Sequence, residues 1–153
     1  MDKNFYITTP IYYPSARPHM GHAYSSIIAD FFSRFKTIDG YKVYFLTGTD
    51  EHGLKIQRSA EKEGLDPLKF CDQISKTFRD LSKTLNLSNT DFIRTTEERH
   101  KKTVQHLWKE LEKNDDIYLS NYSGWYSVSD EAFYNEDEIE EVEGKKISIS
   151  SKS

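Results

Sequence analysis

An alternation of strand and helix patterns near the N-terminus constrains the fold of this chain more than any other feature. Residues 5–9 (FYITT) are aromatic and β-branched and are closed by Pro10, as expected for a strand that runs into a loop. From His22 to Asp39 apolar residues recur at helical spacing, and residues 41–47 (YKVYFLT) return to strand chemistry. The helically spaced residues are Tyr24, Ile27, Ile28, Phe31, Phe32 and Phe35. A helix between two strands makes them parallel neighbours, so we predict an α/β fold, the first half of a Rossmann-type doubly wound parallel sheet.

The remaining sequence predicts more helices and then short strands. Asp66 followed by Pro67 is a helix start signal, and Thr95 and Glu98 have the spacing of a capping box. The predicted helices cover residues 54–63, 66–85 and 95–114, and the predicted strands cover residues 92–94, 117–119 and 125–128. Residues 135–153 are acidic and then polar, with no clear buried face, so we assign no element to them.

The composition fits one globular domain of ordinary size. Of 153 residues, 36% are hydrophobic and 14% aromatic, which supports a folded core. Cys71 is the single cysteine, which excludes an intramolecular disulfide and a zinc site built from several thiolates. The formal net charge of −4 disfavours a stand-alone nucleic-acid binder, because such proteins usually carry an excess of basic residues. No apolar run is long enough to span a membrane and the N-terminus does not resemble a signal peptide, so we expect a cytoplasmic protein with no membrane partner.

The segment His19-Met20-Gly21-His22 lies where the first loop meets the first helix. Its simplest interpretation is a pair of surface histidines at a helix start. The alternative is a nucleotide site, because a helix N-terminus presents unpaired N–H groups and two imidazoles add donors for the same anion. Gly21 would let a flat adenine approach the backbone, and His19 and His22 would stabilise charge on a pentacoordinate α-phosphorus. The strand before this segment and the helix after it favour the nucleotide site.

Residues 50–52 (Asp-Glu-His) follow the second predicted strand, and three interpretations stay open at this stage. Asp50 could cap the following helix from a polar turn. The loop could join His19 and His22 in a metal cluster, although no H-E-x-x-H or facial-triad spacing is present. Asp50 could also pair with a substrate ammonium, for which a partly buried carboxylate at a strand end is well suited. Because both loops follow strand C-termini, we expect them to face the same pocket.

Two other groups of side chains are ambiguous. Tyr12 and Tyr13, before Pro14, could be loop packing or the wall of an apolar substrate pocket, and their position favours the pocket. Residues 97–102 alternate in sign, and we interpret them as a solvated helix face without a catalytic role.

Two longer stretches carry a resemblance to a known family. TTPIYYPSARPHMGHAYSSIIADFFSRF (residues 8–35) and FLTGTDEHGLKIQRSA (residues 45–60) resemble the N-terminal half of the catalytic domain of methionyl-tRNA synthetases. PHMGH corresponds to the HIGH signature of class I aminoacyl-tRNA synthetases. DFIRTTEERHKK and GWYSVSDEAFYNEDE also resemble that family, so the resemblance covers nearly the whole chain.

The resemblance implies a domain organisation and a reaction. Residues 1–115 would form the N-terminal half of a class I catalytic (Rossmann) domain, and residues 116–153 would begin the connective-peptide insertion. The family's methionine-tRNA ligases use ATP and Mg²⁺ to convert methionine to methionyl-adenylate and then transfer it to tRNA(Met) during protein biosynthesis.

The same resemblance implies roles for single residues. Asp50 would hold the methionine ammonium, and Ile11 and Tyr13 would contact the amino acid, whose unbranched thioether suits an apolar wall. His19 and His22 would be catalytic and would contact the ATP phosphates. The positions matched to ATP are His19, Gly21 and His22.

The chain departs from the family pattern in two respects. Ser127 and Asp130 stand where many relatives begin a zinc knuckle with Cys-x-x-Cys, so we expect no zinc. The chain also stops inside the insertion, before the second half of the nucleotide fold, the KMSKS loop and the anticodon-binding domain, and residues 151–153 (SKS) come too early to be that loop. We therefore expect an N-terminal fragment that is inactive alone and is complemented by the missing C-terminal part. The alternatives are a non-catalytic interaction module and a stand-alone H-x-G-H nucleotidylyltransferase, which the TGTDEHG stretch disfavours.

Overall fold

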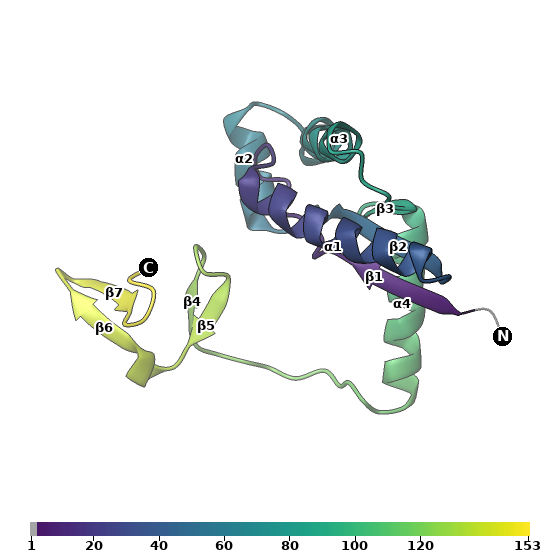
Figure 1. Cartoon of the computed structure of the whole chain (residues 1–153). Coiled ribbons are helices and arrows are strands. Elements are labelled where there is room, and N and C mark those ends of the chain that lie inside the picture. Colours follow the sequence, from purple (N-terminus) through teal and green to yellow (C-terminus); the bar gives the residue numbers. More distant parts are fainter. Residues whose placement is uncertain (1–2) are drawn as a thin grey trace. The chain divides into compact units, whose positions relative to one another are not determined.

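The computed structural model describes residues 3–153. The chain divides into two compact units, Met1–Lys109 and Glu110–Ser153, and the division falls inside helix α4 (Glu98–Lys113). Figure 1 labels the helices and strands of both units. Within the described residues, no helix is both long enough and apolar enough to cross a membrane.

The first unit is built on a parallel sheet of three strands, which confirms the predicted α/β class. The strands are β1 (Asn4–Thr8), β2 (Lys42–Thr49) and β3 (Asp91–Arg94), in the order β1-β2-β3. Ile7 pairs with Phe45, and Leu46 pairs with Asp91. The connecting helices are α1 (Met20–Ile38), α2 (Leu54–Lys62) and α3 (Pro67–Thr84). The carboxyl ends of β1 and β2 therefore lie side by side, where loops of a parallel sheet form binding sites (Figure 1).

Local sequence signals account for most of these elements. Asp66 caps α3, because its Oδ1 accepts hydrogen bonds from the N–H groups of Leu68 and Lys69, and Pro67 occupies the first turn, as predicted. Gly48 is required where β2 passes β3, since a Cβ at this position would lie 2.0 Å from the carbonyl oxygen of Ile93.

The core lies where α2 and α3 pack near the sheet. One buried cluster joins α2 to α3 and contains Ile56, Ala60, Phe70 and Cys71. A second cluster contains Tyr12, Phe78 and Phe92 and so brings together the loop after β1, helix α3 and strand β3. The loop that carries the predicted site is therefore anchored in the core by Tyr12.

Helix α1 exists as predicted, but its apolar stripe is not buried. Phe31, Phe35 and Ile38 are exposed by 64%, 52% and 87%. The buried residues of the helix are Ser26, Ala29, Asp30 and Ser33. This polar face can be buried because the loop before β3 satisfies it, Asp30 Oδ1 accepting from the N–H of Ser88 at 2.5 Å. Periodicity correctly grouped the residues that share a face, but it does not say which face packs on the sheet.

The second unit contains two small antiparallel sheets, β4 (Trp125–Ser127) with β5 (Ala132–Tyr134) and β6 (Ile139–Val142) with β7 (Lys145–Ser148). A short 3-10 helix, Glu136–Glu138, precedes β6. The predicted strand at residues 117–119 is wrong, since those residues form no regular element. The β6–β7 hairpin was not predicted because its strands are polar and its turn, Glu143-Gly144 with φ values of 52° and 75°, lacks the usual Asn-Gly signal.

Candidate functional site

Tyr12 joins the two loops that the sequence predicts to share a pocket. Its carbonyl accepts from the N–H of Asp50 at 2.8 Å, and its own N–H donates to the carbonyl of Gly48 at 2.9 Å. Its ring packs against the imidazole of His22, with centroids 4.8 Å apart. Its hydroxyl bonds to Ser26 at 2.8 Å inside α1. Tyr12 is buried, so loop packing is the correct interpretation for this residue, and the packing ties the histidine segment to the Asp50 loop.

The two histidines form a reciprocal cap at the start of α1. His19 is the N-cap residue, and its Nδ1 accepts from the N–H of Gly21 at 3.0 Å. The Nδ1 of His22 accepts from the N–H of His19, also at 3.0 Å. The two rings lie 3.9 Å apart between centroids. The interpretation as a helix start and the interpretation as an anion site are therefore compatible, because the caps use only one nitrogen of each ring.

The capping bonds also fix the state of the rings. An imidazole nitrogen that accepts a backbone hydrogen bond carries no proton, so neutral His19 and His22 each have N–H on Nε2. Burial, together with the neighbouring His19, lowers the pKa of His22 below 6.5. Near neutral pH, His22 is a neutral imidazole whose Nε2–H can donate a hydrogen bond.

Gly21 has a local steric reason to be glycine. A Cβ at this position would lie 2.9 Å from Cε1 of His19, so a side chain would displace the imidazole that caps the helix. The adenine contact implied by the family resemblance stays a prediction.

Asp50 lies at the end of β2 and is held by neighbouring elements. Besides the backbone bond to Tyr12, its Oδ1 accepts from the hydroxyl of Thr95 at 3.5 Å. It does not cap α2, because the N-cap of that helix is Gly53, which provides no side-chain bond. Among the described residues no group of three or more His, Cys, Asp or Glu side chains could hold a metal ion. The helix-cap interpretation of Asp50 is therefore wrong, and the absence of a metal at this loop stays a prediction.

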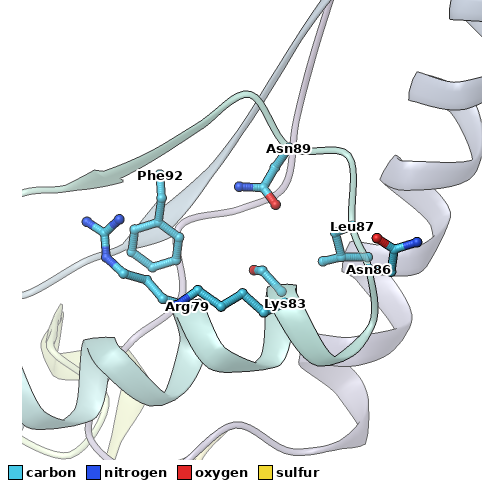
Figure 2. A pocket seen from close by; sticks show the side chains of 7 residues that line it. Arg79, Lys83, Asn86, Leu87, Asn89 and Phe92 are labelled. Carbon is cyan, nitrogen blue, oxygen red and sulfur yellow. The ribbon is translucent and has the colours of Figure 1, made fainter.

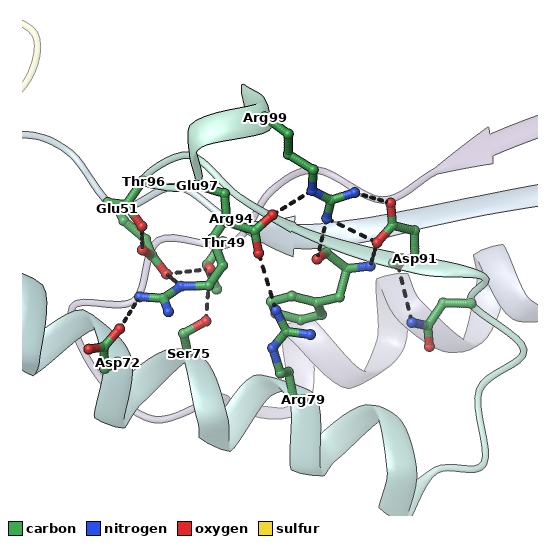
Figure 3. A network of polar contacts seen from close by, with 12 residues as sticks. Thr49, Glu51, Asp72, Ser75, Arg79, Asp91, Arg94, Thr96, Glu97 and Arg99 are labelled. Atoms are coloured by element: carbon green, nitrogen blue, oxygen red, sulfur yellow. Dashed lines mark hydrogen bonds and ion pairs between the residues drawn. The ribbon is translucent and has the colours of Figure 1, made fainter. Parts of the chain in front are cut away.

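Glu51, next to Asp50, is the centre of a buried polar network (Figure 3). Its side chain is 0% exposed and forms an ion pair with Nε of Arg94 at 2.7 Å. It also accepts from the hydroxyls of Thr49 at 2.8 Å and Thr96 at 2.5 Å. Burial by itself raises the pKa of Glu51, but the hydrogen bonds from Arg94, Thr96 and Thr49 outweigh it, so the pKa is lowered. Glu51 is therefore an anion in the folded protein.

The sequence prediction for Thr95 is corrected by this network. Thr95 does not cap α4, which begins three residues later at Glu98. Its hydroxyl instead accepts from the N–H of Glu51 at 2.8 Å and donates to Asp50. The roles of Glu51, Arg94 and Thr95 were missed because residues 94–96 are distant in sequence from residues 50 and 51, and only strand pairing brings them together.

The two residues expected to contact the amino acid lie beside this loop. The hydroxyl of Tyr13 donates to the carbonyl of His52 at 2.7 Å, and its ring packs against the core cluster of α2 and α3. Ile11 is 39% exposed at the surface of the same loop. Tyr13 is thus positioned by the Asp50 loop, while the contact of either side chain with a substrate stays a prediction.

The same unit also contains a cavity of about 540 Å³ (Figure 2). It is lined by Arg79, Ser82, Lys83, Asn86, Leu87, Asn89 and Phe92. It lies between the end of α3 and the beginning of β3, whereas the candidate site is at the carboxyl ends of the strands. The cationic groups of this cavity already have acidic partners, Glu97 at 3.5 Å from Arg79 and Asp80 at 3.7 Å from Lys83. We therefore place the candidate site at the two loops and not in this cavity.

In the second unit, Asp130 forms a hydrogen-bonded cluster with the hydroxyls around it. It accepts from Tyr134 at 2.9 Å, from Ser151 at 2.5 Å and from Ser153. The hydroxyl of Ser127 accepts from the N–H of Asp130 at 3.2 Å. Hydrogen bonds from Ser151 and Ser153 lower the pKa of Asp130 to about 2. Ser127 and Asp130 are thus joined to each other and to residues 151–153 by hydrogen bonds.

The first unit thus combines a parallel sheet, a histidine-capped helix after β1 and a partly buried acidic loop after β2. Residues 5–146 match the family model described as tRNA synthetases class I (M), and the chain belongs to this family.

Several relatives within the family are much longer than this chain. The chain is 52% identical over 142 residues to a methionine–tRNA ligase of Listeria monocytogenes, covering 92% of this chain and 21% of the relative. It is 50% identical over 155 residues to a mitochondrial methionine–tRNA ligase of Takifugu rubripes, covering 99% of this chain and 26% of the relative. A crystal structure of the Mycobacterium tuberculosis methionyl-tRNA synthetase bound by methionyl-adenylate superposes with a TM-score of 0.91 at 44% identity, over 99% of this chain and 30% of that one. The chain therefore spans about a quarter of the length of its curated relatives.

Proposed function

We propose that this chain provides the first half of a methionine-activating site and works as part of a methionine-tRNA ligase. The observation that supports this most is the connection made by Tyr12, whose backbone holds the Asp50 loop and whose ring holds His22. One buried residue thus sets the distance between the histidine pair, which would bind phosphate, and the Asp50 carboxylate. A site that joins a nucleotide to an amino acid needs both groups in a fixed relation.

The histidine pair and the Asp50 carboxylate would have different roles in the reaction. In the reaction, a carboxylate oxygen of methionine attacks the α-phosphorus of ATP and the bond to pyrophosphate breaks. The Nε2–H groups of His19 and His22 would donate to phosphate oxygens as negative charge builds up there, and Gly21 would face the adenine. Asp50 would bind the ammonium group and so aim the methionine carboxylate at phosphorus.

The thioether side chain of methionine would lie against Ile11 and Tyr13. Tyr13 offers a rigid aromatic surface because its hydroxyl is tied to the carbonyl of His52. An unbranched, polarizable side chain suits such a surface. These two residues supply only part of a pocket, and the remainder would come from polypeptide outside this chain.

ATP would bring Mg²⁺ as its phosphate complex, since the described residues contain no group that could hold a metal by itself. No zinc is proposed for the second unit, where Ser127 and Asp130 occupy the knuckle positions and are hydrogen-bonded. The macromolecular substrate would be tRNA(Met), bound in the complete enzyme, and we propose a cytoplasmic location.

The chain alone should not complete the reaction. Transition-state stabilisation in a class I site is shared with a mobile lysine-containing loop that the family resemblance locates beyond residue 153. With one side of the site, binding energy cannot be concentrated on the α-phosphate. We therefore propose that activity requires the polypeptide equivalent to the remaining 70% of the Mycobacterium tuberculosis chain, since 30% of it is matched.

Complementation tests this function. The purified chain is mixed or co-expressed with the unmatched C-terminal part of the Mycobacterium tuberculosis enzyme, and methionine-dependent ATP–pyrophosphate exchange is measured for the mixture and for each part alone. We expect exchange from the mixture only. Association of the two parts without exchange would instead support a non-catalytic interaction module. Nucleotidyl transfer by the chain alone without methionine would support the nucleotidylyltransferase alternative.

A further inference from the structure

We propose that Glu51, Arg94 and Thr95 are positioning residues that set the direction of the Asp50 carboxylate and thereby the selectivity of the site for an amino-acid ammonium group. This inference rests on the proposed function, because Asp50 is the proposed ammonium ligand. The two adjacent acids would then have different roles: Asp50 binds the substrate, and Glu51 does not contact it.

Glu51 cannot meet a substrate because it is enclosed and fully bonded. Its side chain is 0% exposed, and the residue as a whole is 4% exposed. Its carboxylate already has one cationic partner and two hydroxyl donors, so a second cation would have no open approach. The buried acid is thus part of the polar network that joins β2, β3 and α3 (Figure 3).

The charge of Glu51 is neutralised by Arg94. Arg94, at the end of β3, contacts Glu51 through Nε, and its Nη2 lies 2.6 Å from Asp72 on α3. The side chain of Arg94 is 18% exposed, so this ion pair is shielded from water. A shielded pair with additional hydrogen bonds holds its geometry more firmly than a surface pair. The pair therefore fixes the Asp50–Glu51 backbone against β3 and α3.

Thr95 connects the backbone of Glu51 to the Asp50 carboxylate by hydrogen bonds. Its hydroxyl oxygen accepts from the N–H of Glu51 at 2.8 Å, which directs its single proton elsewhere. Oδ1 of Asp50 lies 3.5 Å from this hydroxyl oxygen and is the acceptor for its proton. Thr95 is itself fixed, being 5% exposed and donating its own N–H to the carbonyl of Thr49 at 3.2 Å. A donor to one oxygen sets the plane of a carboxylate, and with it the direction from which an ammonium group is bound.

The first test uses the chain alone and does not depend on enzymatic activity. Amide hydrogen exchange is followed by NMR for the wild type, Thr95→Val, Thr95→Ser and Glu51→Gln. In Thr95→Val the Glu51 amide loses its acceptor, so its protection should fall about tenfold, whereas Thr95→Ser keeps it. In Glu51→Gln the Asp50 amide, bonded to Tyr12, should lose about tenfold in protection while the Thr9 amide, bonded to Leu46 in the sheet, is unchanged. Unchanged protection at the Glu51 and Asp50 amides would overturn the proposal.

The second test uses the chain complemented with the C-terminal part of the Mycobacterium tuberculosis enzyme. Glu51→Gln and Thr95→Val should raise the KM for methionine about tenfold and leave the KM for ATP within about twofold. Thr95→Ser should restore the wild-type KM, and Glu63→Gln, at an exposed acid of similar chemistry, should have no effect. A general loss of folding would lower the fraction of active enzyme, and so kcat per total chain, with both KM values unchanged, and that result would contradict a positioning role.

Different results would contradict the proposed function and the positioning role. If the complemented wild type shows no exchange, or if Asp50→Asn leaves exchange unchanged, the proposed function fails, and the hydrogen-exchange test still decides whether Glu51 and Thr95 control the loop. If Asp50→Asn abolishes exchange while Glu51→Gln and Thr95→Val leave the KM for methionine unchanged, the proposed function stands and the positioning role is wrong.

Discussion

At the residue scale, the side chains of the site combine a structural bond with a free functional group. His19 and His22 use Nδ1 to cap α1, which leaves Nε2–H for a ligand. Tyr12 uses its backbone to hold Asp50 and its ring to hold His22. Because the structural bonds fix each group before a ligand arrives, less conformational entropy is lost on binding.

The neutral state of His22 leads to a prediction about stability and pH. Its pKa is lowered from 6.5, so the folded chain binds a proton there less readily than the unfolded chain. The stabilising effect of neutral His22 is complete above the unfolded pKa and is lost as pH falls through the interval below it. Urea unfolding at about pH 7.5 and about pH 5.5 should therefore show a larger loss of stability for the wild type than for His22→Asn, which keeps an acceptor for the His19 N–H but does not titrate. An equal loss in both proteins would contradict this assignment.

At the element scale, the strands and helices with strong local signals could be predicted, and those that depend on distant partners could not. Asp66-Pro67 starts α3 where expected because a cap acts within its own turn. Thr95 was misassigned as a cap because its true partners, Asp50 and Glu51, lie on another loop. The sequence singled out His19, His22 and Asp50 because their loops follow strand ends, and their roles stay predictions. Tyr12 was interpreted as a pocket wall, and Arg94 gave no signal in the sequence.

Gly48 gives a prediction about strand pairing. Gly48→Ala would place a methyl group 2.0 Å from the carbonyl oxygen of Ile93, and backbone cannot move aside as a flexible side chain can. We expect a loss of more than about 3 kcal/mol of unfolding free energy, or no folded protein. Gly21→Ala is the matched control, because it meets only the His19 ring, and should cost less than about 1 kcal/mol. Equal unfolding midpoints in urea for the two variants would show that the β2–β3 approach is not limiting.

The Asp130 cluster gives a prediction for the second unit. Its pKa of about 2 lies below the ordinary 3.8, so the cluster stabilises the unit above that ordinary value and loses its effect as pH falls through about 2. In NMR spectra recorded from about pH 5 to about pH 2, the Ser151 and Ser153 amides should titrate with a midpoint near 2 in the wild type and should not titrate in Asp130→Asn. A midpoint near 4 would mean that the serine hydroxyls do not hold the carboxylate. Adding Zn²⁺ should change neither spectrum.

At the scale of the whole molecule, the first unit exposes more apolar surface than an isolated domain normally does. Tyr6 and Tyr44 stack on the sheet at a centroid distance of 5.7 Å and remain 59% and 46% exposed. The exposed stripe of α1 adds Tyr24, Ile27, Ile28, Phe31, Phe32, Phe35 and Ile38. Patches of this kind mark interfaces or lead to association. We expect them to be covered when the chain is complemented.

The isolated chain should therefore associate in solution. Sedimentation velocity is expected to show concentration-dependent oligomers for the wild type and mainly monomers for a Phe31→Gln, Phe35→Gln double variant with an unchanged circular dichroism spectrum. A Tyr118→Gln, Leu119→Gln double variant is the matched control, since these residues are also exposed but lie in the second unit. A monomeric wild type would show that the stripe of α1 does not drive association.

In the proposed function the Asp50 loop and the histidine pair, joined by Tyr12, divide the work of methionine activation. Steady-state pyrophosphate exchange by the complemented chain measures this division. Asp50→Asn should raise the KM for methionine about 100-fold with the KM for ATP unchanged. His22→Asn should lower kcat about 100-fold with the KM for methionine unchanged. If both variants change the same kinetic constants, or if neither changes any, the division of work between the Asp50 loop and the histidine corner is wrong.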